Sequence, residues 1–132
     1  MQITFIETIL FVKDQSLSRD FYQKTFHLSP VLDVPGMTEF KLAEFFKLGL
    51  MPEAGIRKIL LDKTRDPAKG NGIPRCEIYL YVEDVDKAYE NAIKAGAKLI
   101  SETEDRDWGD RVCYFADPDG HILAFAKRIL GN

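Results

Sequence analysis

The hydrophobic and polar positions along the chain follow one order of elements in the first half. Residues 3–12 are rich in Ile, Phe, Val and Thr and end at a polar run, which predicts a strand. Residues 17–26 carry apolar side chains at the spacing of one buried helical stripe. The members of that stripe are Leu17, Phe21, Tyr22 and Phe26. Three short apolar runs separated by turn residues then predict an antiparallel meander over residues 31–34, 37–43 and 45–51.

The second half repeats this order. Residues 77–82 predict a strand, Asp84 is a candidate helix N-cap, and residues 85–95 form a helical pattern that ends at Gly96. Three further strands are expected over residues 98–101, 111–116 and 122–127. The segment ILFVKD, which ends at Asp14, aligns with YLYVED, which ends at Asp84, at an offset of 70 residues (84 − 14). The chain is therefore predicted to contain one structural unit twice.

The repeat predicts an α+β fold of two βαβββ modules. A single module leaves one face of its sheet uncovered, so two modules are expected to form curved mixed sheets around a shared cavity. We expect one domain over residues 1–132, with module one at 1–51, a linker at 52–75 and module two at 76–132. Within the linker, residues 56–61 predict a helical turn. The acidic run 102–107 predicts a solvated loop.

Strand alternation separates an aliphatic face from a face suited to a ligand. In each first strand the aliphatic residues are expected to meet the helix, which leaves the other face toward the cavity. The predicted cavity-facing residues are Glu7, Ile9 and Phe11 in module one and Glu77, Tyr79 and Tyr81 in module two. This aromatic and acidic composition is more typical of a ligand pocket than of a dry core.

Composition excludes several classes of function. The chain is 45% hydrophobic and 30% charged, with a formal net charge of −3, which gives no electrostatic reason to bind nucleic acid. No apolar run reaches the roughly 20 residues of a membrane span, and the first residues do not form a signal peptide. Cys76 and Cys113 show no metal-ligand spacing. A cytoplasmic protein with reduced thiols is expected.

Three segments together resemble the glyoxalase/bleomycin-resistance/dioxygenase superfamily, also called the vicinal oxygen chelate superfamily. They are VKDQSLSRDFYQKTF, VEDVDKAYENAIKAGAKL and DWGDRVCYFADPDGHILAF, the last with a DPDG turn before the final strand. The resemblance covers nearly the whole chain and implies the paired-module fold. It does not fix the chemistry, because this scaffold hosts lyases, isomerases, dioxygenases and non-catalytic drug-binding proteins.

The resemblance also identifies where metal ligands would lie. Metalloenzymes of the superfamily place a ligand early in the first strand of each module and another in its last strand, and the matching positions here are Glu7, Gly49, Glu77 and Ala124. Only two of these can ligate, whereas stable transition-metal sites use three or more protein ligands. We therefore expect no metal and no other cofactor. A divalent metal would require unidentified ligands to complete Glu7 and Glu77. His121, after the DPDG turn, is expected to be a rim residue.

The candidate site residues each have more than one interpretation. Glu7 and Glu77 form a candidate catalytic pair, either for acid/base chemistry or for recognising a cationic ligand, and the alternative is a salt bridge from each to Lys47 or Arg111. The candidate ligand-binding residues are Phe11, Tyr79, Tyr81, Trp108 and Arg111. Trp108 could stack on a flat ligand or anchor an interface. Arg111 could neutralise an anion or pair with Asp110.

Two functions from different classes follow. The first is a binding protein that sequesters a small organic ligand without a complete metal site. The second is a metal-dependent lyase, isomerase or dioxygenase of the glyoxalase type, and the residues leave open whether the chain is an enzyme. The resemblance implies a homodimer in either case. A regulatory dimer with a vestigial cavity is a third alternative.

Overall fold

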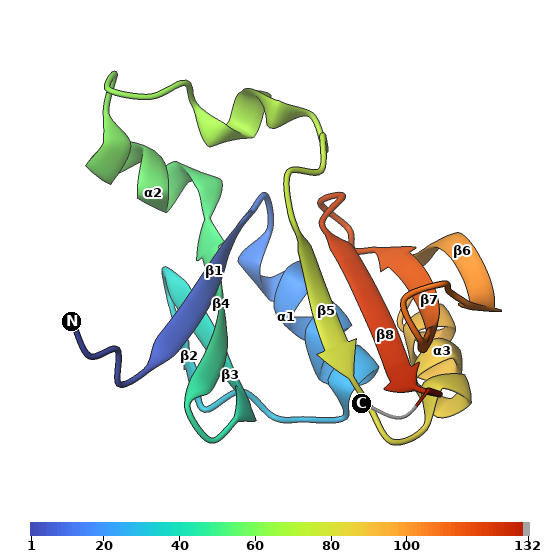
Figure 1. The fold of residues 1–132 in the computed structure, drawn as a ribbon. Coiled ribbons are helices and arrows are strands. Elements are labelled where there is room, and N and C mark those ends of the chain that lie inside the picture. Colours follow the sequence, from blue (N-terminus) through green and yellow to red (C-terminus); the bar gives the residue numbers. More distant parts are fainter. Residues whose placement is uncertain (131–132) are drawn as a thin grey trace. The chain divides into compact units, whose positions relative to one another are not determined.

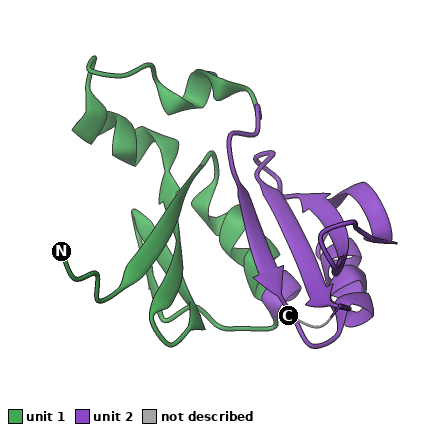
Figure 2. Ribbon diagram, in the orientation of Figure 1, with its two compact units in different colours: residues 1–23, 27–71 green, residues 24–26, 72–132 purple. Residues whose placement is uncertain are grey.

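The computed structural model describes residues 1–130 and divides the chain into two compact units. The first unit covers residues 1–23 and 27–71, and the second covers residues 24–26 and those from Gly72 onward (Figure 2). Each unit contains one four-stranded mixed sheet, and neither sheet is closed on itself. The α+β fold class is thus confirmed, and the shared cavity between modules stays a prediction.

The first unit contains a βαβββ series followed by two short helices (Figure 1). Its elements are β1 (Ile6–Val12), α1 (Gln15–Phe26), β2 (Leu32–Val34), β3 (Met37–Ala43), β4 (Phe46–Pro52), α2 (Glu53–Leu60) and the 3₁₀ helix η1 (Pro67–Gly70). The sheet order is β1-β4-β3-β2, with β1 parallel to β4 and the other pairs antiparallel.

The second unit repeats this arrangement. Its elements are β5 (Glu77–Tyr81), α3 (Val85–Lys94), β6 (Lys98–Asp105), β7 (Asp110–Ala116) and β8 (Ile122–Arg128). The sheet order is β5-β8-β7-β6, again with the first strand parallel to the last and the others antiparallel. The two sheets therefore have the same topology, as the offset of their sequences predicted.

The matching aspartates begin matching helices. The Asp14 side chain accepts a hydrogen bond from Leu17 N at 3.0 Å, and the Asp84 side chain accepts one from Lys87 N at 3.0 Å. Both residues have extended backbone and precede the first helical residue, so each satisfies one amide that the helix leaves without a partner. An aspartate N-cap thus starts the helix in both modules.

Each module buries its aliphatic strand face and one helical stripe. In module one the largest contributions come from β1 and from the middle of α1, where Tyr22 is fully buried and packs near Phe40 of β3. In module two Ile78, Phe115 and Phe125 are buried. The buried set agrees with the predicted aliphatic faces at Leu10, Val12 and Ile78, but Ile6 at the start of β1 is 52% exposed and Leu17 in the first turn of α1 is 53% exposed.

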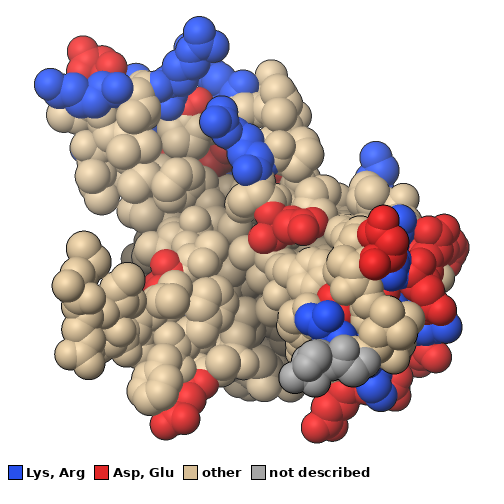
Figure 3. Space-filling model, viewed as in Figure 1, with Lys and Arg blue, Asp and Glu red and all other residues tan. Residues whose placement is uncertain are grey.

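The linker is more ordered than its composition suggests. The helical turn expected over residues 56–61 is confirmed as part of α2, which buries none of its residues. The N-cap Asp66 accepts a hydrogen bond from Ala68 N at 3.0 Å and so starts η1. Lys and Arg side chains are concentrated over α2 and the segment that follows it (Figure 3). None of the helices in residues 1–130 has the length and apolar character needed to cross a membrane.

One expectation about secondary structure was wrong. The run 102–107 was expected to be a loop, but β6 continues through Asp105 as the edge strand of its sheet. Charged side chains suit an edge strand because they discourage pairing with a second sheet, so an acidic run does not exclude a strand. Cys113 is buried, but Cys76 is exposed; both thiols are free, as expected.

Candidate functional site

Aromatic side chains of the second unit gather on one face of its sheet. This aromatic face consists of Tyr79, Tyr81, Trp108 and Tyr114. The first two alternate with core residues along β5 and so project from the same side of the strand. Below the rings lies a floor of small buried side chains, formed by Val112, Ala124 and Ala126, against which Tyr79 and Tyr114 pack. Tyr81 is 58% exposed and Trp108 49% exposed, so large ring surfaces face solvent.

The carboxylate of Asp110 connects these rings. Its side chain is fully buried at the start of β7, and its Oδ2 accepts hydrogen bonds from Tyr79 Oη at 2.7 Å and Tyr81 Oη at 2.8 Å. The two bonds, together with the positive charge of Arg128, hold the pKa of Asp110 below its usual range against the opposing effect of burial. Asp110 is therefore a carboxylate at neutral pH and an acceptor only.

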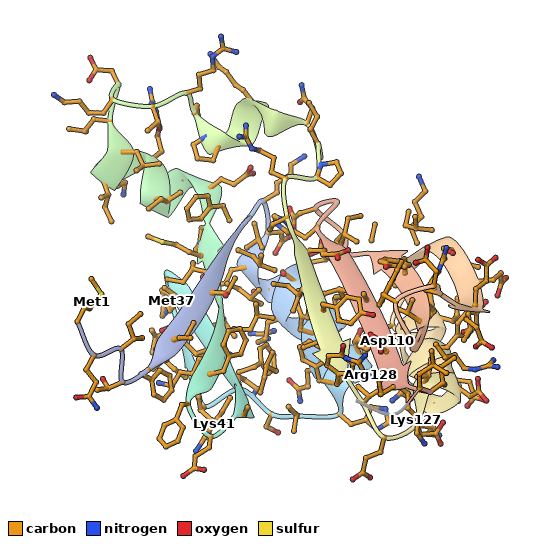
Figure 4. The ribbon with its side chains drawn as sticks, viewed as in Figure 1. Met1, Met37, Lys41, Asp110, Lys127 and Arg128 are labelled. Carbon is orange, nitrogen blue, oxygen red and sulfur yellow. The ribbon has the colours of Figure 1, made fainter. Side chains whose placement is uncertain are left out.

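Arg128 supplies the opposite charge from the end of β8. Its Nε lies 3.3 Å from Asp110 Oδ1 as an ion pair, although none of the residues in the described chain makes a hydrogen bond to that oxygen. Figure 4 shows the two labelled side chains next to each other on neighbouring strands, which agrees with their cross-strand register. The guanidinium also lies 5.8 Å from the centre of the Tyr81 ring. The buried carboxylate is thus paired, as burial of a charge requires.

Trp108 completes the network from the loop before β7. Its Nε1 donates to Tyr79 Oη at 3.0 Å, while the Tyr79 and Tyr81 rings meet edge to face with centroids 5.4 Å apart. Burial, opposed by the Trp108 bond and assisted by Asp110, raises the pKa of Tyr79 to about 12. Tyr79 therefore keeps its proton at neutral pH and cannot act as a base. Tyr79, Tyr81 and Trp108 were predicted as ligand-binding residues from the sequence, whereas Asp110 was considered only as a partner for Arg111.

Arg111 does not join the aromatic face. It alternates with Asp110 and Val112 along β7 and so lies on the opposite side of the sheet. Its Nε forms an ion pair with Asp105 Oδ1 at 3.1 Å, across the β6–β7 pair. The ion pair predicted for Arg111 exists, but its partner is Asp105 and not Asp110.

A second cluster of polar residues lies in the first unit. Strand register places Glu7 beside Lys47 and Glu39 beside Gly49, all on one face of the β1-β4-β3 sheet. Lys47 Nζ contacts Glu39 Oε1 at 3.2 Å. Burial first, and then the hydrogen bond and the charge of Glu39, raise the pKa of Glu7 to about 6. The same hydrogen bond lowers the pKa of Glu39, so Glu7 is the carboxyl group that takes up the proton as the pH falls through about 6.

Gly49 makes room for this pair. A Cβ atom at Gly49 would lie 2.6 Å from Glu7 Oε2, a distance that real Cβ atoms do not reach. The Glu7 oxygen thus occupies the volume where a side chain at 49 would begin. The salt bridge considered for Glu7 with Lys47 is formed by Glu39 instead. Glu39 was missed because nothing in the local sequence shows which residue lies across the sheet.

The remaining candidate residues lie in different units. Phe11 is half-buried on β1, four residues after Glu7 and on the same face of the strand. Glu77 is exposed at the start of β5, on the same face as Tyr79, and its charge contributes to a raised pKa of Tyr114. Glu7 belongs to the first unit and Glu77 to the second. Their pairing as a catalytic dyad stays a prediction.

The four positions assigned to metal ligands do not provide a metal-binding set. Gly49 has no side chain, and Ala124 contributes a buried methyl group to the floor of the aromatic face. Glu7 is hydrogen-bonded to Glu39, and the Lys47 ammonium already supplies positive charge there. These residues therefore do not fit the four-ligand centre of the metalloenzymes.

A different group of ligand-type side chains forms in the turn before β8. Asp117, Asp119 and His121, the last of which was expected to be a rim residue, bring one ligand atom each within 4.8 Å of one another. Their separation by two residues each in a tight turn is the sequence signal that could have predicted this group. Asp117 Oδ1 accepts from Asp119 N at 2.9 Å and from His121 N at 2.8 Å, so its carboxylate closes the turn.

Comparisons with known proteins agree with the fold. A family model described as "Glyoxalase-like domain" matches residues 5–129. An uncharacterized protein of Mycobacterium bovis is 32% identical over 123 residues, which cover 91% of this chain and 80% of that protein. The uncharacterized protein YraH of Bacillus subtilis is 27% identical over 123 residues, covering 91% of this chain and 94% of its own.

Solved structures show the same architecture. A glyoxalase/bleomycin resistance protein/dioxygenase from Nocardioides superposes with a TM-score of 0.80 at 21% identity, covering 100% of this chain and 87% of that one. A glyoxalase-related enzyme from Fulvimarina pelagi gives a TM-score of 0.79 at 21% identity, covering 96% and 88% of the two chains. At these identities the likeness concerns the fold alone.

Proposed function

Since the chain belongs to the glyoxalase-like domain family, within the vicinal oxygen chelate superfamily that its sequence resembled, we propose that it binds a small flat organic ligand on its aromatic face without a metal. The observation that carries the proposal is the ring network around Asp110. Tyr79, Tyr81 and Trp108 are held by hydrogen bonds within one cluster, while about half of the Tyr81 and Trp108 side chains stays exposed.

Preorganised aromatic surface is suited to binding. Rings that are fixed before the ligand arrives lose little conformational freedom on binding, so more of the stacking energy appears as affinity. An exposed group of large rings is also costly for a protein without a use for it, because its burial would be favourable. The interpretation of Trp108 as a residue that stacks on a ligand is thus supported over that of a packing anchor.

The competing function is a glyoxalase-type lyase, isomerase or dioxygenase that uses a divalent metal. It has less support, because positions 49 and 124 lack ligand side chains and Glu7 is held by Glu39. A metal-free acid/base role for Glu7 is compatible with its pKa of about 6, which lies near the range a general base needs. We include a homodimer in the proposal, as the resemblance implies.

A thermal-shift screen of flat aromatic compounds tests the binding proposal. A bound ligand raises Tm by mass action, and Tyr81→Ala and Trp108→Ala should each reduce that shift. Phe45→Ala is the matched control, since Phe45 is an exposed ring in the turn between β3 and β4. The proposal fails if the shift is equal in all four proteins.

Elemental analysis of protein purified without a metal-affinity tag separates the two functions. We expect less than stoichiometric metal and no change in Tm on addition of manganese, nickel, zinc or iron(II). Stoichiometric metal that is lost in both Glu7→Gln and Glu77→Gln would favour the metalloenzyme. Light scattering then measures the oligomeric state, for which a mass of twice 15.1 kDa is expected.

A further inference from the structure

We propose that Asp110 sets the hydrogen-bonding polarity of the aromatic face, so that the face selects cationic, hydrogen-bond-donating ligands over anions. The inference rests on the proposed function and specifies its ligand class. Asp110 acts here as a positioning residue, because the ligand would touch the rings and not the buried carboxylate.

The donors of three of the four aromatic side chains are already committed. A tyrosine hydroxyl has one hydrogen to donate and two lone pairs that accept. Tyr79 and Tyr81 both give their hydrogen to Asp110. Trp108 gives its single N–H to Tyr79 Oη. A ligand on the face therefore meets ring surfaces and phenolic lone pairs, and these three side chains offer it no hydrogen.

The remaining acceptors can be counted in the same way. Tyr79 Oη already accepts from Trp108, and Tyr81 Oη accepts from Arg128 Nη2 at 3.3 Å. Each hydroxyl thus keeps one lone pair for a ligand. An ammonium group is matched to two such acceptors, whereas a carboxylate would set lone pairs against lone pairs.

The electrostatics on this side of the sheet also favour a cationic ligand. A phenol that donates to a carboxylate becomes richer in electrons, which strengthens the attraction of a cation to its ring. The guanidinium over Tyr81 shows that a cation occupies such a position within the protein. Asp110 forms an ion pair with Arg128. Glu77, on the same face of β5 as Tyr79, adds a carboxylate to this side of the sheet.

Two cations on the face could favour an anion: Arg106, whose guanidinium lies 5.6 Å from the centre of the Tyr114 ring, and Arg128. The Arg128 side chain is 48% exposed, and its contacts to Asp110, Tyr81 Oη and Trp108 O leave some of its hydrogens for solvent. The Arg128 guanidinium lies 3.3 Å from Tyr81 Oη and 3.3 Å from Asp110 Oδ1, so it is close to the hydroxyl groups that the ligand would meet. Titration with an anionic probe decides between these two preferences.

Three compounds of similar shape form the test: benzylammonium, benzyltrimethylammonium and phenylacetate. The first is a cation with N–H donors, the second a cation without them, and the third an anion. Trp108 is the single tryptophan, so one indole N–H resonance reports binding at the face during an NMR titration. We expect benzylammonium to bind about tenfold more tightly than phenylacetate, which is the size of one hydrogen bond to a charged group.

Asp110→Asn separates polarity from structure. Asparagine keeps the size. Its carbonyl oxygen is favoured beside Arg128, where Asp110 Oδ1 now lies 3.3 Å from Nε, and this orientation puts the amide NH₂ in the place of Oδ2. The two tyrosine hydroxyls then accept from the amide and turn their hydrogens outward. We expect affinity for benzylammonium to fall and affinity for phenylacetate to rise, with their ratio changing about tenfold. Loss of negative charge alone would weaken both cations equally, so a larger loss for benzylammonium than for benzyltrimethylammonium identifies the polarity effect.

Asp105→Asn is the matched control, since Asp105 pairs with Arg111 on the opposite side of the sheet, and it should leave all ratios unchanged. Tyr81→Phe serves if Asp110→Asn does not fold, and it should lower the preference for benzylammonium over benzyltrimethylammonium. Unchanged ratios in the folded variants overturn the inference alone. If no compound moves the Trp108 resonance in these titrations and none raises Tm in the thermal-shift screen, the proposed function fails as well.

Discussion

Glu7 and Glu39 are hydrogen-bonded carboxyl groups in the first sheet, and they hold a proton between them up to about pH 6. The pKa of Glu7 is about 6 in the folded chain, against an ordinary value of 4.5, because burial and the neighbouring carboxylate disfavour its charge. A raised folded-state pKa means that the folded protein binds the proton more tightly than the unfolded chain. Its contribution to stability is therefore fully present below pH 4.5 and is lost as the pH rises through 6.

Glu7→Gln should remove this dependence on pH. The amide donates a hydrogen bond to Glu39 at every pH, so the variant should gain on the order of 1 kcal/mol over the parent at neutral pH. Urea unfolding at a series of pH values measures the difference. Glu44→Gln is the control, as Glu44 is exposed in the turn between β3 and β4. Parallel curves for Glu7→Gln and the parent would contradict the shared proton.

Gly49→Ala should separate the two glutamates. The new Cβ would lie 2.6 Å from Glu7 Oε2, and the carboxyl group is the flexible partner that moves. We expect the pKa of Glu7 to fall from about 6 toward 4.5, as measured by NMR titration of the side-chain carboxyl carbons. In the control Gly55→Ala the added Cβ would make an ordinary contact of 3.8 Å with Met51. A Glu7 pKa that stays near 6 in Gly49→Ala would show that burial alone raises it.

Asp110→Ala should lower Tm by roughly 5–10 °C. The substitution leaves two tyrosine hydroxyls without their acceptor and Arg128 without its partner. Asp105→Ala removes a half-exposed ion pair with Arg111 and should lower Tm far less. Differential scanning calorimetry compares them. Equal effects would mean that the buried network contributes no more than a surface ion pair.

Asp14→Ala and Asp84→Ala should destabilise the protein by similar amounts, about 1 kcal/mol each. Each variant removes the acceptor for one amide in the first turn of its helix, at 3.0 Å in both cases. Asn is also a favourable N-cap, so Asp14→Asn and Asp84→Asn should retain most of the stability. Chemical denaturation measures all four. A large loss at only one position would indicate that the two modules do not use their caps equivalently.

The duplicated fold could be predicted because short-range sequence patterns determine its elements. Helix caps, alternating strands and turn residues each act over a few residues, and they recur at Asp14 and Asp84 in the same order. The edge strand β6 was missed in part, because an exposed edge tolerates charged residues that resemble a loop. Local sequence does not distinguish these two cases.

The candidate site was predictable only where strand alternation decides the outcome. Tyr79 and Tyr81 follow from alternation along β5, and Trp108 from its place near the turn into β7. Asp110 and Glu39 owe their roles to neighbours across the sheet, so their partners depend on register. A charged residue in a strand is usually solvated, and nothing in DWGDR indicates that the second aspartate is fully buried.

Gly49 also limits which side chains this position can take. A glutamate introduced there would place its first side-chain carbon in the space that Glu7 Oε2 now fills. Glu7 would therefore have to move before position 49 could present a carboxylate. The contact ties the side chain that position 49 accepts to the conformation of a residue that is distant in sequence but lies on the adjacent strand of the sheet.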